Sequence, residues 1–282
     1  MSTLARQPVG FGIIHGFYDF DPDRLVEEAR HAEALGFDAF SLADHLHTEH
    51  PTLEPWTALT WVAAATQRIE LMSNVLGLPY RPPAVTAKMA ETLDRLSGGR
   101  LVLGLGVGGY DHEFSSFGLA ERTPGQKVSA LGEAVQIIRG LWNEPAVSYE
   151  GQHFQVREAR IEPKPAHPIP IWLGAHKPRM QDLVGRKADG WLPSLPVMEP
   201  GGLPKGNAII DDAARAAGRD PREITRLLNI FPDQQTPEAL AQMTLEDGVS
   251  IFILASDDPD VLERFAGETI PAVREHVARG RK

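Results

Sequence analysis

Two kinds of hydrophobic pattern alternate along the chain. Short, continuously apolar segments have the length and composition of strands that are buried on both faces. Longer segments place apolar residues three or four positions apart, as on the buried face of an amphipathic helix. The strands are predicted at residues 9–14, 39–42, 69–76, 101–105, 169–173, 190–192, 224–231 and 250–254. A helical segment is predicted after each of them.

This repeated order of strand and helix predicts a parallel sheet, because each helix must carry the chain back before the next strand begins. No low-complexity linker interrupts the order. Eight units without a domain break favour a closed barrel over an open sheet. We therefore predict a single domain, residues 1–282, with the α/β fold of a (β/α)₈ TIM barrel.

Two segments depart from the repeat. Residues 147–156 have the pattern of a β-hairpin around Glu150 and Gly151, which predicts a small excursion from the barrel. Residues 193–206 are rich in proline and glycine and predict a loop, with the next helix beginning near Asn207. A long loop near a barrel mouth is a candidate lid, so we expect this one to act as a lid-like loop.

Composition narrows the class of protein. The chain is 42% hydrophobic, which is enough for a large core, and it contains no cysteine. Disulfides and thiolate metal sites are therefore excluded, and a reducing cytoplasm is the expected location. The net charge of −10 makes nucleic acid or an anionic membrane an unsuitable partner. The expected partner is a small-molecule substrate.

Glycines and polar residues follow several of the predicted strands. In a barrel of this type the functional groups come from the carboxyl ends of the strands. The richest segment is the C-terminal end of the strand at residues 101–105, where four glycines between residues 104 and 109 precede titratable residues. Glycine lets a flat ring or a phosphate approach the backbone. The candidate positions are His15, Asp44, His45, Asn74, Gly106–Gly109, Glu113 and Gly174–Lys177.

Three interpretations of these positions remain open at this point. Gly104, Gly106 and Gly109 match the G-x-G-x-x-G dinucleotide fingerprint, but they lie a hundred residues into the chain rather than in a first βαβ unit. His45 and His47, with carboxylates nearby, suggest a metal-dependent hydrolase, although no further clear ligand follows a later strand. A protein that carries a cofactor without turning it over would have the same site.

Four segments, in this order, resemble a known family: GFDAFSLADH, NVLGLPYRPPAVTAKMAETLDRLSGGRLVLGLGVGG, VSYEGQHF and PIPIWLGAHKPRMQDLVGRKADGW. The chain resembles the bacterial luciferase-like monooxygenase superfamily, in particular its branch that uses the deazaflavin coenzyme F420. The resemblance implies a TIM barrel with a tricyclic ring at its mouth. It also implies a non-proline cis peptide bond between Asn74 and Val75, against which the ring packs.

The resemblance also assigns the residues of the site. The implied cofactor contacts are Asp44, Asn74, Val75, Gly106, Val107, Gly108, Gly174, Ala175, His176 and Lys177. His45 is the main acid–base candidate, because imidazole titrates near neutrality. Asp44 and His45 match the acid–histidine pair of the family, and Glu113 matches a glutamate common in the wider family, so both carboxylates are further catalytic candidates. His15 and Trp191 are expected to line the substrate pocket. No metal ligand is predicted.

The implied activity is hydride transfer between F420 and a small organic substrate, since a deazaflavin acts as a hydride carrier. An FMN-dependent monooxygenase is the nearest alternative. Lys177 and Arg179 favour F420, because they offer positive charge to its acidic tail. The sugar-phosphate dehydrogenases of this branch carry a glutamate where this chain has Gly109, so their substrate is not carried over. Related proteins are often dimers, which makes a homodimer an expectation.

Overall fold

Eight parallel strands close into a barrel in the computed structural model, which describes residues 9–16, 21–47, 49–232 and 235–281. β1 pairs with both β2 and β11, and β3 pairs with β5, so the ring of strands has no open edge. The predicted TIM barrel is thereby confirmed. The barrel strands are β1 (Gly10–Ile14), β2 (Ala39–Leu42), β3 (Glu70–Ser73), β5 (Leu101–Gly106), β8 (Ile171–Leu173), β9 (Gly190–Trp191), β10 (Thr225–Ile230) and β11 (Ile251–Ala255).

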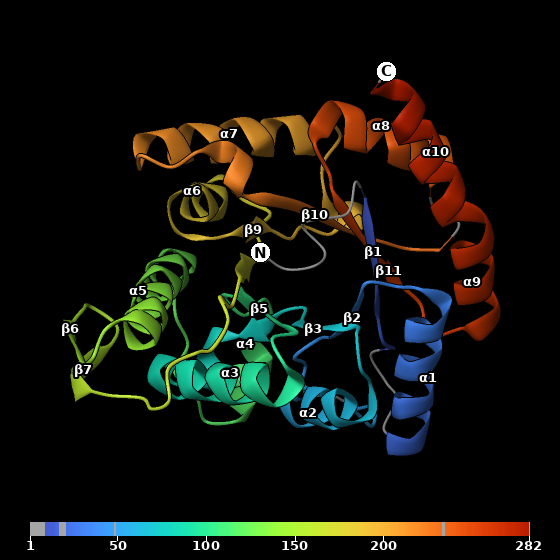
Figure 1. Ribbon diagram of the computed structural model, residues 1–282. Coiled ribbons are helices and arrows are strands. Elements are labelled where there is room, and N and C mark those ends of the chain that lie inside the picture. The colour runs from blue at the N-terminus through green and yellow to red at the C-terminus, as the bar shows by residue number, and fades with distance from the viewer. Residues whose placement is uncertain (1–8, 17–20, 48, 233–234, 282) are drawn as a thin grey trace.

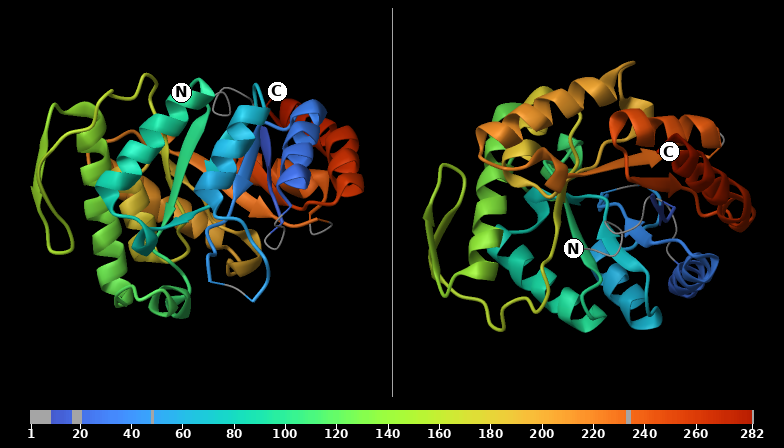
Figure 2. Two further views of the ribbon diagram at one scale, coloured as in Figure 1. Left: turned by 90° about the horizontal axis from the view of Figure 1, so that it is seen from below. Right: turned by 45° about the horizontal axis from the view of Figure 1, so that its top comes forward.

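Helices surround the strands on the outside (Figures 1 and 2). Seven of the ten described helices begin at a proline, which suits the first position because it has no N–H that needs an acceptor. Five of these also follow a capping side chain, as at Asp21 and Thr123. The helices are α1 (Pro22–Leu35), α2 (Pro55–Ala65), α3 (Pro83–Ser97), α4 (Asp111–Ser116), α5 (Pro124–Asn143), α6 (Pro178–Lys187), α7 (Gly202–Ala216), α8 (Pro237–Asp247), α9 (Pro259–Arg264) and α10 (Ile270–Gly280).

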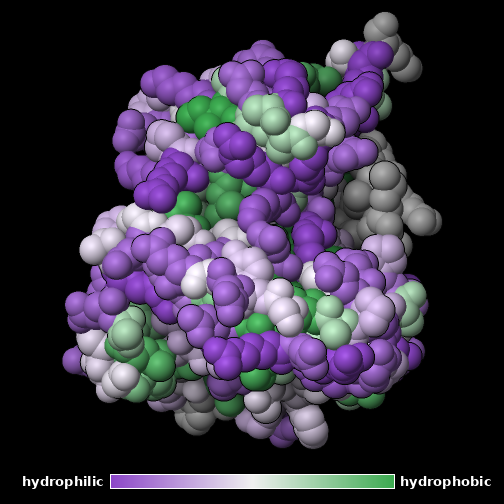
Figure 3. Space-filling view, turned by 90° about the vertical axis from the view of Figure 1, so that its left-hand side faces the viewer, coloured by the Kyte–Doolittle hydropathy of each residue, from purple (hydrophilic) through white to green (hydrophobic). Residues whose placement is uncertain are grey.

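The core has two layers, as a two-sided strand pattern requires. One cluster contains residues such as Met72, Trp172 and Leu227 and fills the barrel. The larger cluster lies between the strands and the helices. Figure 3 shows that one face of the exterior is mainly hydrophilic, with apolar side chains in small separate patches. Within the described ranges, no helix has the length and hydrophobicity to cross a bilayer.

The predicted hairpin is confirmed, whereas the predicted loop is shorter than expected. The hairpin is confirmed: β6 (Val147–Glu150) and β7 (Gln155–Ala159) pair antiparallel beside α5 at the edge of the molecule (Figure 1). The loop at residues 193–206 is shorter than predicted, because α7 begins at Gly202 instead of near Asn207. A Cβ atom on Gly206 would lie 2.4 Å from the Trp191 ring, so this glycine serves helix packing rather than a loop.

Candidate active site

The end of the third strand forms the floor of the barrel mouth. The Asn74–Val75 peptide bond is cis, as the resemblance implied. It divides the predicted third strand into β3 and the short β4 (Leu76–Gly77). The Val75 side chain lies against glycines of two neighbouring strands, since a Cβ atom would be 2.5 Å from it at Gly106 and 3.3 Å at Gly174. An apolar side chain surrounded by bare backbone is a surface on which a flat ring can rest.

The side chain of Asn74 makes its hydrogen bonds to other residues of the barrel. Its amide nitrogen donates to the side-chain oxygen of Asn229 on β10 at 2.9 Å, and Asn229 donates back at 3.1 Å. Asn229 also donates to the Ser194 hydroxyl at 3.1 Å. Asn74 therefore stabilises the floor by connecting strands on opposite sides of the barrel. Its side chain is occupied by these hydrogen bonds, so the predicted contact with the cofactor would come from the Asn74 backbone and from Val75.

His45 and Glu113 form the principal polar pair of the mouth. His45 follows β2, and its Nδ1 lies 2.9 Å from Oε1 of Glu113 on α4. The Tyr80 hydroxyl donates to the other oxygen, Oε2, at 3.2 Å. Burial, together with the adjacent Glu113 charge, raises the pKa of Tyr80, so the phenol keeps its proton. The Glu113 side chain is 8% exposed and that of His45 is 39% exposed, so the imidazole is the part that a substrate can reach.

Asp44 does not supply the acidic partner expected for His45. Its side chain is fully buried, and its two oxygens accept from Arg81 at 2.7 and 3.2 Å. One of them also accepts from the backbone N–H of Gly77 at 2.8 Å. Burial raises the pKa of Asp44, and hydrogen bonding from the Arg81 guanidinium opposes that shift. Neighbouring residues after a strand point in different directions, which separates Asp44 from His45.

This arrangement predicts a structural effect of Asp44→Asn. The amide keeps the shape of the carboxylate but removes the negative charge that pairs with Arg81, whose side chain is only 12% exposed. Hydrogen bonds to charged groups contribute roughly 1.5–3 kcal/mol each, so we expect a loss of about 2 kcal/mol of unfolding free energy. Urea denaturation of the wild type and variant measures it. A loss below about 0.5 kcal/mol would show that Arg81 finds full compensation in Glu54, its second partner.

His15 lies behind the mouth. Its Nδ1 is 2.7 Å from Glu28 of α1, and both side chains are buried. Burial raises the pKa of Glu28, which the hydrogen bond with His15 opposes. Among the described residues, Nε2 of His15 and Oε1 of Glu28 have no hydrogen-bond partner. His15 thus remains close to the site, though against α1 and not in the open mouth.

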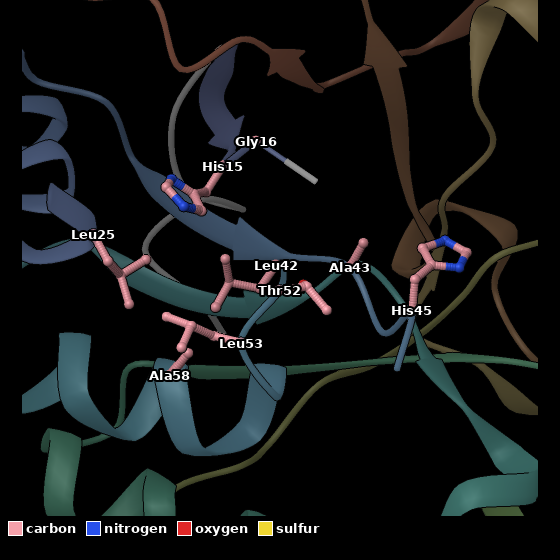
Figure 4. A pocket seen from close by; sticks show the side chains of 9 residues that line it. All are labelled: His15, Gly16, Leu25, Leu42, Ala43, His45, Thr52, Leu53 and Ala58. Atoms are coloured by element: carbon pink, nitrogen blue, oxygen red, sulfur yellow. The ribbon is translucent and has the colours of Figure 1, made fainter. Parts of the chain in front are cut away.

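A small cavity connects His15 with His45. Its volume is about 20 Å³, which suits roughly one water molecule. In the view of Figure 4 the two imidazoles lie on opposite sides of it. Aliphatic side chains and one hydroxyl form the rest of the lining, namely Leu25, Leu42, Ala43, Thr52, Leu53 and Ala58, together with Gly16.

The position of Trp191 corrects its expected role. The indole is 1% exposed and belongs to the core layer between the strands and the helices. Its Nε1 donates to the Ala175 carbonyl at 2.7 Å, and its ring packs on Gly206 of α7. Trp191 therefore does not line the mouth. On a two-residue strand, periodicity does not reveal which face a side chain takes.

The glycine-rich turn and the start of α6 complete the rim. Gly108 has a φ of 82° and its carbonyl accepts from Lys127 at 2.9 Å, which fixes the turn beside Val107. Gly174 and Ala175 follow β8, while His176 and Lys177 are exposed at the N-terminus of α6. All of the sequence-predicted cofactor segments therefore lie at the carboxyl ends of strands, on one face of the barrel.

Three residues of the site were not found from the sequence: Tyr80, Arg81 and Asn229. Tyr80 and Arg81 lie between β4 and α3, where no periodic pattern applies, and Asn229 is one polar position within an apolar strand. The proline-rich stretch around residues 79–83 was the available signal for a fixed turn. Within the described part of the chain, no group of three or more His, Asp or Glu side chains is arranged to hold a metal ion.

Known proteins match this chain over most of its length. A family model described as luciferase-like monooxygenase matches residues 3–276. An F420-dependent glucose-6-phosphate dehydrogenase of Microbacterium testaceum is 30% identical over 96% of this chain and 87% of its own. Three other dehydrogenases of that name are matched over 58, 54 and 57% of their lengths.

Further matches come from an archaeal enzyme and a solved structure. A 5,10-methylenetetrahydromethanopterin reductase of Archaeoglobus fulgidus is 31% identical over 91% of this chain and 76% of its own. An F420-dependent secondary alcohol dehydrogenase, solved with an F420–acetone adduct, has a TM-score of 0.82 at 20% identity, covering 94% of this chain and 99% of its own. The fold agrees throughout, and the family model spans nearly the whole sequence. The chain belongs to the luciferase-like monooxygenase family.

Proposed function

We propose that this protein is an F420-dependent oxidoreductase that transfers a hydride between the deazaflavin and a small organic substrate. One observation carries the proposal: an exposed imidazole, His45, is held by the buried Glu113 beside the apolar floor that Val75 forms. Such a site needs only to position two carbon atoms, exclude water and exchange one proton. The names of the matched relatives support F420 as the hydride carrier.

The residues at the mouth fit a flat ring with an acidic tail. Val75 is half-buried among Gly104, Gly106 and Gly174, which leaves one apolar surface without side chains around it. Lys177 and Arg179 are exposed at the N-terminus of α6, where backbone N–H groups also favour an anion. The ring would lie on Val75 and the glycine turn at residues 106–108, and the tail would extend toward α6.

Bound F420 would supply the hydride acceptor or donor. For an alcohol, the carbon loses a hydride and the hydroxyl loses a proton, which leaves a carbonyl. His45 takes this proton on Nε2, because Nδ1 faces Glu113. The Glu113 carboxylate stabilises the imidazolium that results, and the Tyr80 hydroxyl fixes the carboxylate. In the reverse direction the same imidazolium returns the proton to the carbonyl oxygen.

Binding titrations with F420 and FMN test the proposal against the nearest alternative. We expect saturable quenching of F420 fluorescence and at least about tenfold weaker binding of FMN, which lacks the acidic tail. Tight FMN binding with oxygen consumption would favour the monooxygenase. If F420 binds but no alcohol, ketone or aldehyde changes its absorbance at 420 nm, the protein acts as a carrier.

A second prediction concerns the cofactor's tail. Lys177→Ala and Arg179→Ala should each weaken F420 binding by roughly threefold, since exposed ion pairs contribute about 0.2–1 kcal/mol. The loss should disappear at high salt, where exposed charges are screened. Arg186→Ala is the matched control, because Arg186 lies at the other end of α6 and pairs with Asp182. Fluorescence titrations at low and high salt measure all three.

Three expectations from the sequence stay predictions. A homodimer is tested by light scattering, and the cytoplasmic location by fractionation. Closure of the loop at residues 193–201 is tested by limited proteolysis with and without F420. Neither nucleic acid nor a membrane is proposed as a partner.

A further inference from the structure

Aromatic rings line one side of the mouth next to His45. The Tyr110 ring lies 5.5 Å from that of His45, between their centroids, and 6.0 Å from that of His112. His112 continues to His47 at 6.1 Å, and His47 to Phe117 at 5.9 Å. We name Tyr110, His112, His47 and Phe117 the aromatic shelf. Its members come from the segments after β2 and β5, which both end at the mouth.

The shelf is unusually exposed for aromatic side chains. Tyr110 is 57% exposed and Phe117 is 50% exposed. Of the described Phe, Trp and Tyr residues, the others with large exposure are Trp61, on the outer side of α2, and Phe231, directly after β10. Exposed apolar surface that gathers at a functional site indicates a binding surface, because nothing else offsets its contact with water.

The charges around the shelf disfavour an anionic ligand. Lys127 is 10% exposed, and it is held by Asp111 at 2.6 Å and by the Gly108 carbonyl at 2.9 Å. Arg81 is held by Asp44 and by Glu54. Both cations are therefore neutralised, while the Asp111 carboxylate remains 52% exposed. A phosphate group at this side of the mouth would have to compete with these carboxylates for Lys127 and Arg81.

The backbone next to the shelf leaves room for a ligand. Gly109 separates the glycine turn from Tyr110, and apart from its two chain neighbours no heavy atom of the described residues lies within 4 Å of the position that a Cβ atom would take there. A flat molecule can therefore approach the backbone at Gly109 while one of its faces lies on the Tyr110 ring. Its polar end would then lie near His45, which is in contact with the same ring.

We propose that the aromatic shelf binds an uncharged, flat aromatic ring of the substrate, so that the reacting alcohol or carbonyl group attached to that ring lies at His45. This proposal rests on the proposed F420-dependent hydride transfer and names its substrate class. It separates the chain from its relatives named as glucose-6-phosphate dehydrogenases, whose substrate is a charged sugar.

The test compares three alcohols with F420 and the full-length protein. We expect the kcat/KM for 1-phenylethanol to exceed that for 2-butanol by about tenfold, because only the phenyl ring can stack on Tyr110. Glucose 6-phosphate should react more slowly than either alcohol. Tyr110→Leu should raise the KM for 1-phenylethanol about tenfold and leave its kcat and both constants for 2-butanol within twofold. Faster turnover of glucose 6-phosphate, or equal losses with both alcohols, would overturn the proposal.

Two variants distinguish the ring from other effects of the substitution. Tyr110→Phe keeps the ring without the hydroxyl and should behave as the wild type. Trp61→Leu removes an aromatic side chain of 58% exposure that lies on α2, outside the aromatic shelf, and should also behave as the wild type. A loss in Tyr110→Phe as large as in Tyr110→Leu would assign the effect to the hydroxyl and contradict stacking.

A measurement without cofactor separates this proposal from the proposed function. Acetophenone is added to the cofactor-free protein, and its binding is followed by saturation-transfer NMR. We expect saturable transfer in the wild type and in Tyr110→Phe, and its loss in Tyr110→Leu, whether or not F420 binds. No transfer in the wild type, or equal transfer in all three, would overturn the shelf as a binding site.

Discussion

Replacing His45 by glutamine is expected to lower kcat for hydride transfer by about 10²–10⁴-fold, the usual contribution of a positioned acid–base group. Glutamine keeps a polar side chain of similar reach but cannot take up the proton that the substrate hydroxyl releases. Glu113→Gln should cause a smaller loss, of roughly tenfold to a hundredfold, because the imidazole stays in place without the charge that stabilises its protonated form. Stopped-flow absorbance at 420 nm measures the hydride-transfer step.

The control for these variants is a second histidine–carboxylate pair of the same kind. Nδ1 of His167 lies 3.0 Å from Asp94, and the imidazole is 46% exposed, against 39% for His45. It contacts Gly99, which precedes β5, and therefore lies at the opposite end of the barrel. His167→Gln should leave kcat within twofold. F420 affinity should stay within about threefold in all variants, and an unchanged kcat in His45→Gln would remove His45 from the mechanism.

Gly104→Ala is expected to be the most damaging single-methyl substitution for stability. Its Cβ atom would lie 1.9 Å from the backbone oxygen of Ser73 on β3, and 3.3 Å from Val75. The contact involves backbone on both sides, and the Ser73 hydroxyl bridges the same strands by accepting from the Gly104 N–H at 3.0 Å and donating to its carbonyl at 2.8 Å. The two strands must therefore separate to make room.

Overpacking and backbone shifts of this kind lower the free energy of unfolding by about 3 kcal/mol or more. For a chain of this size the melting temperature should fall by roughly 6–12 °C, or the protein should fail to accumulate in soluble form. Gly109→Ala is the matched control, since its Cβ atom would meet no described heavy atom within 4 Å apart from its chain neighbours, and we expect the free energy of unfolding to change by less than about 0.5 kcal/mol. Scanning calorimetry of both variants and the wild type measures the melting temperatures. Similar melting temperatures for Gly104→Ala and Gly109→Ala would contradict the prediction, because they would show that β3 and β5 can separate at little cost in stability.

The sequence alone determined the fold and the face of the barrel on which the candidate site lies. Apolar runs marked every barrel strand, and prolines and capping residues marked the start of most helices, because both signals act over a few neighbouring residues. The ends of parallel strands meet at one face of a closed barrel, so finding the strands was enough to place His45, Val75 and the glycine turn together. The family resemblance added the cis bond at residues 74–75.

Only the tertiary structure decided which side chains are partners. Glu113, and not the adjacent Asp44, bonds to His45 across 68 positions, and Asp44 bonds to Arg81 across 37. Trp191 faces the helices rather than the mouth, because α7 begins early enough to pack Gly206 on its ring. Local patterns give the direction of the backbone, but a side-chain contact depends on which distant segments barrel closure brings within about 3 Å of each other.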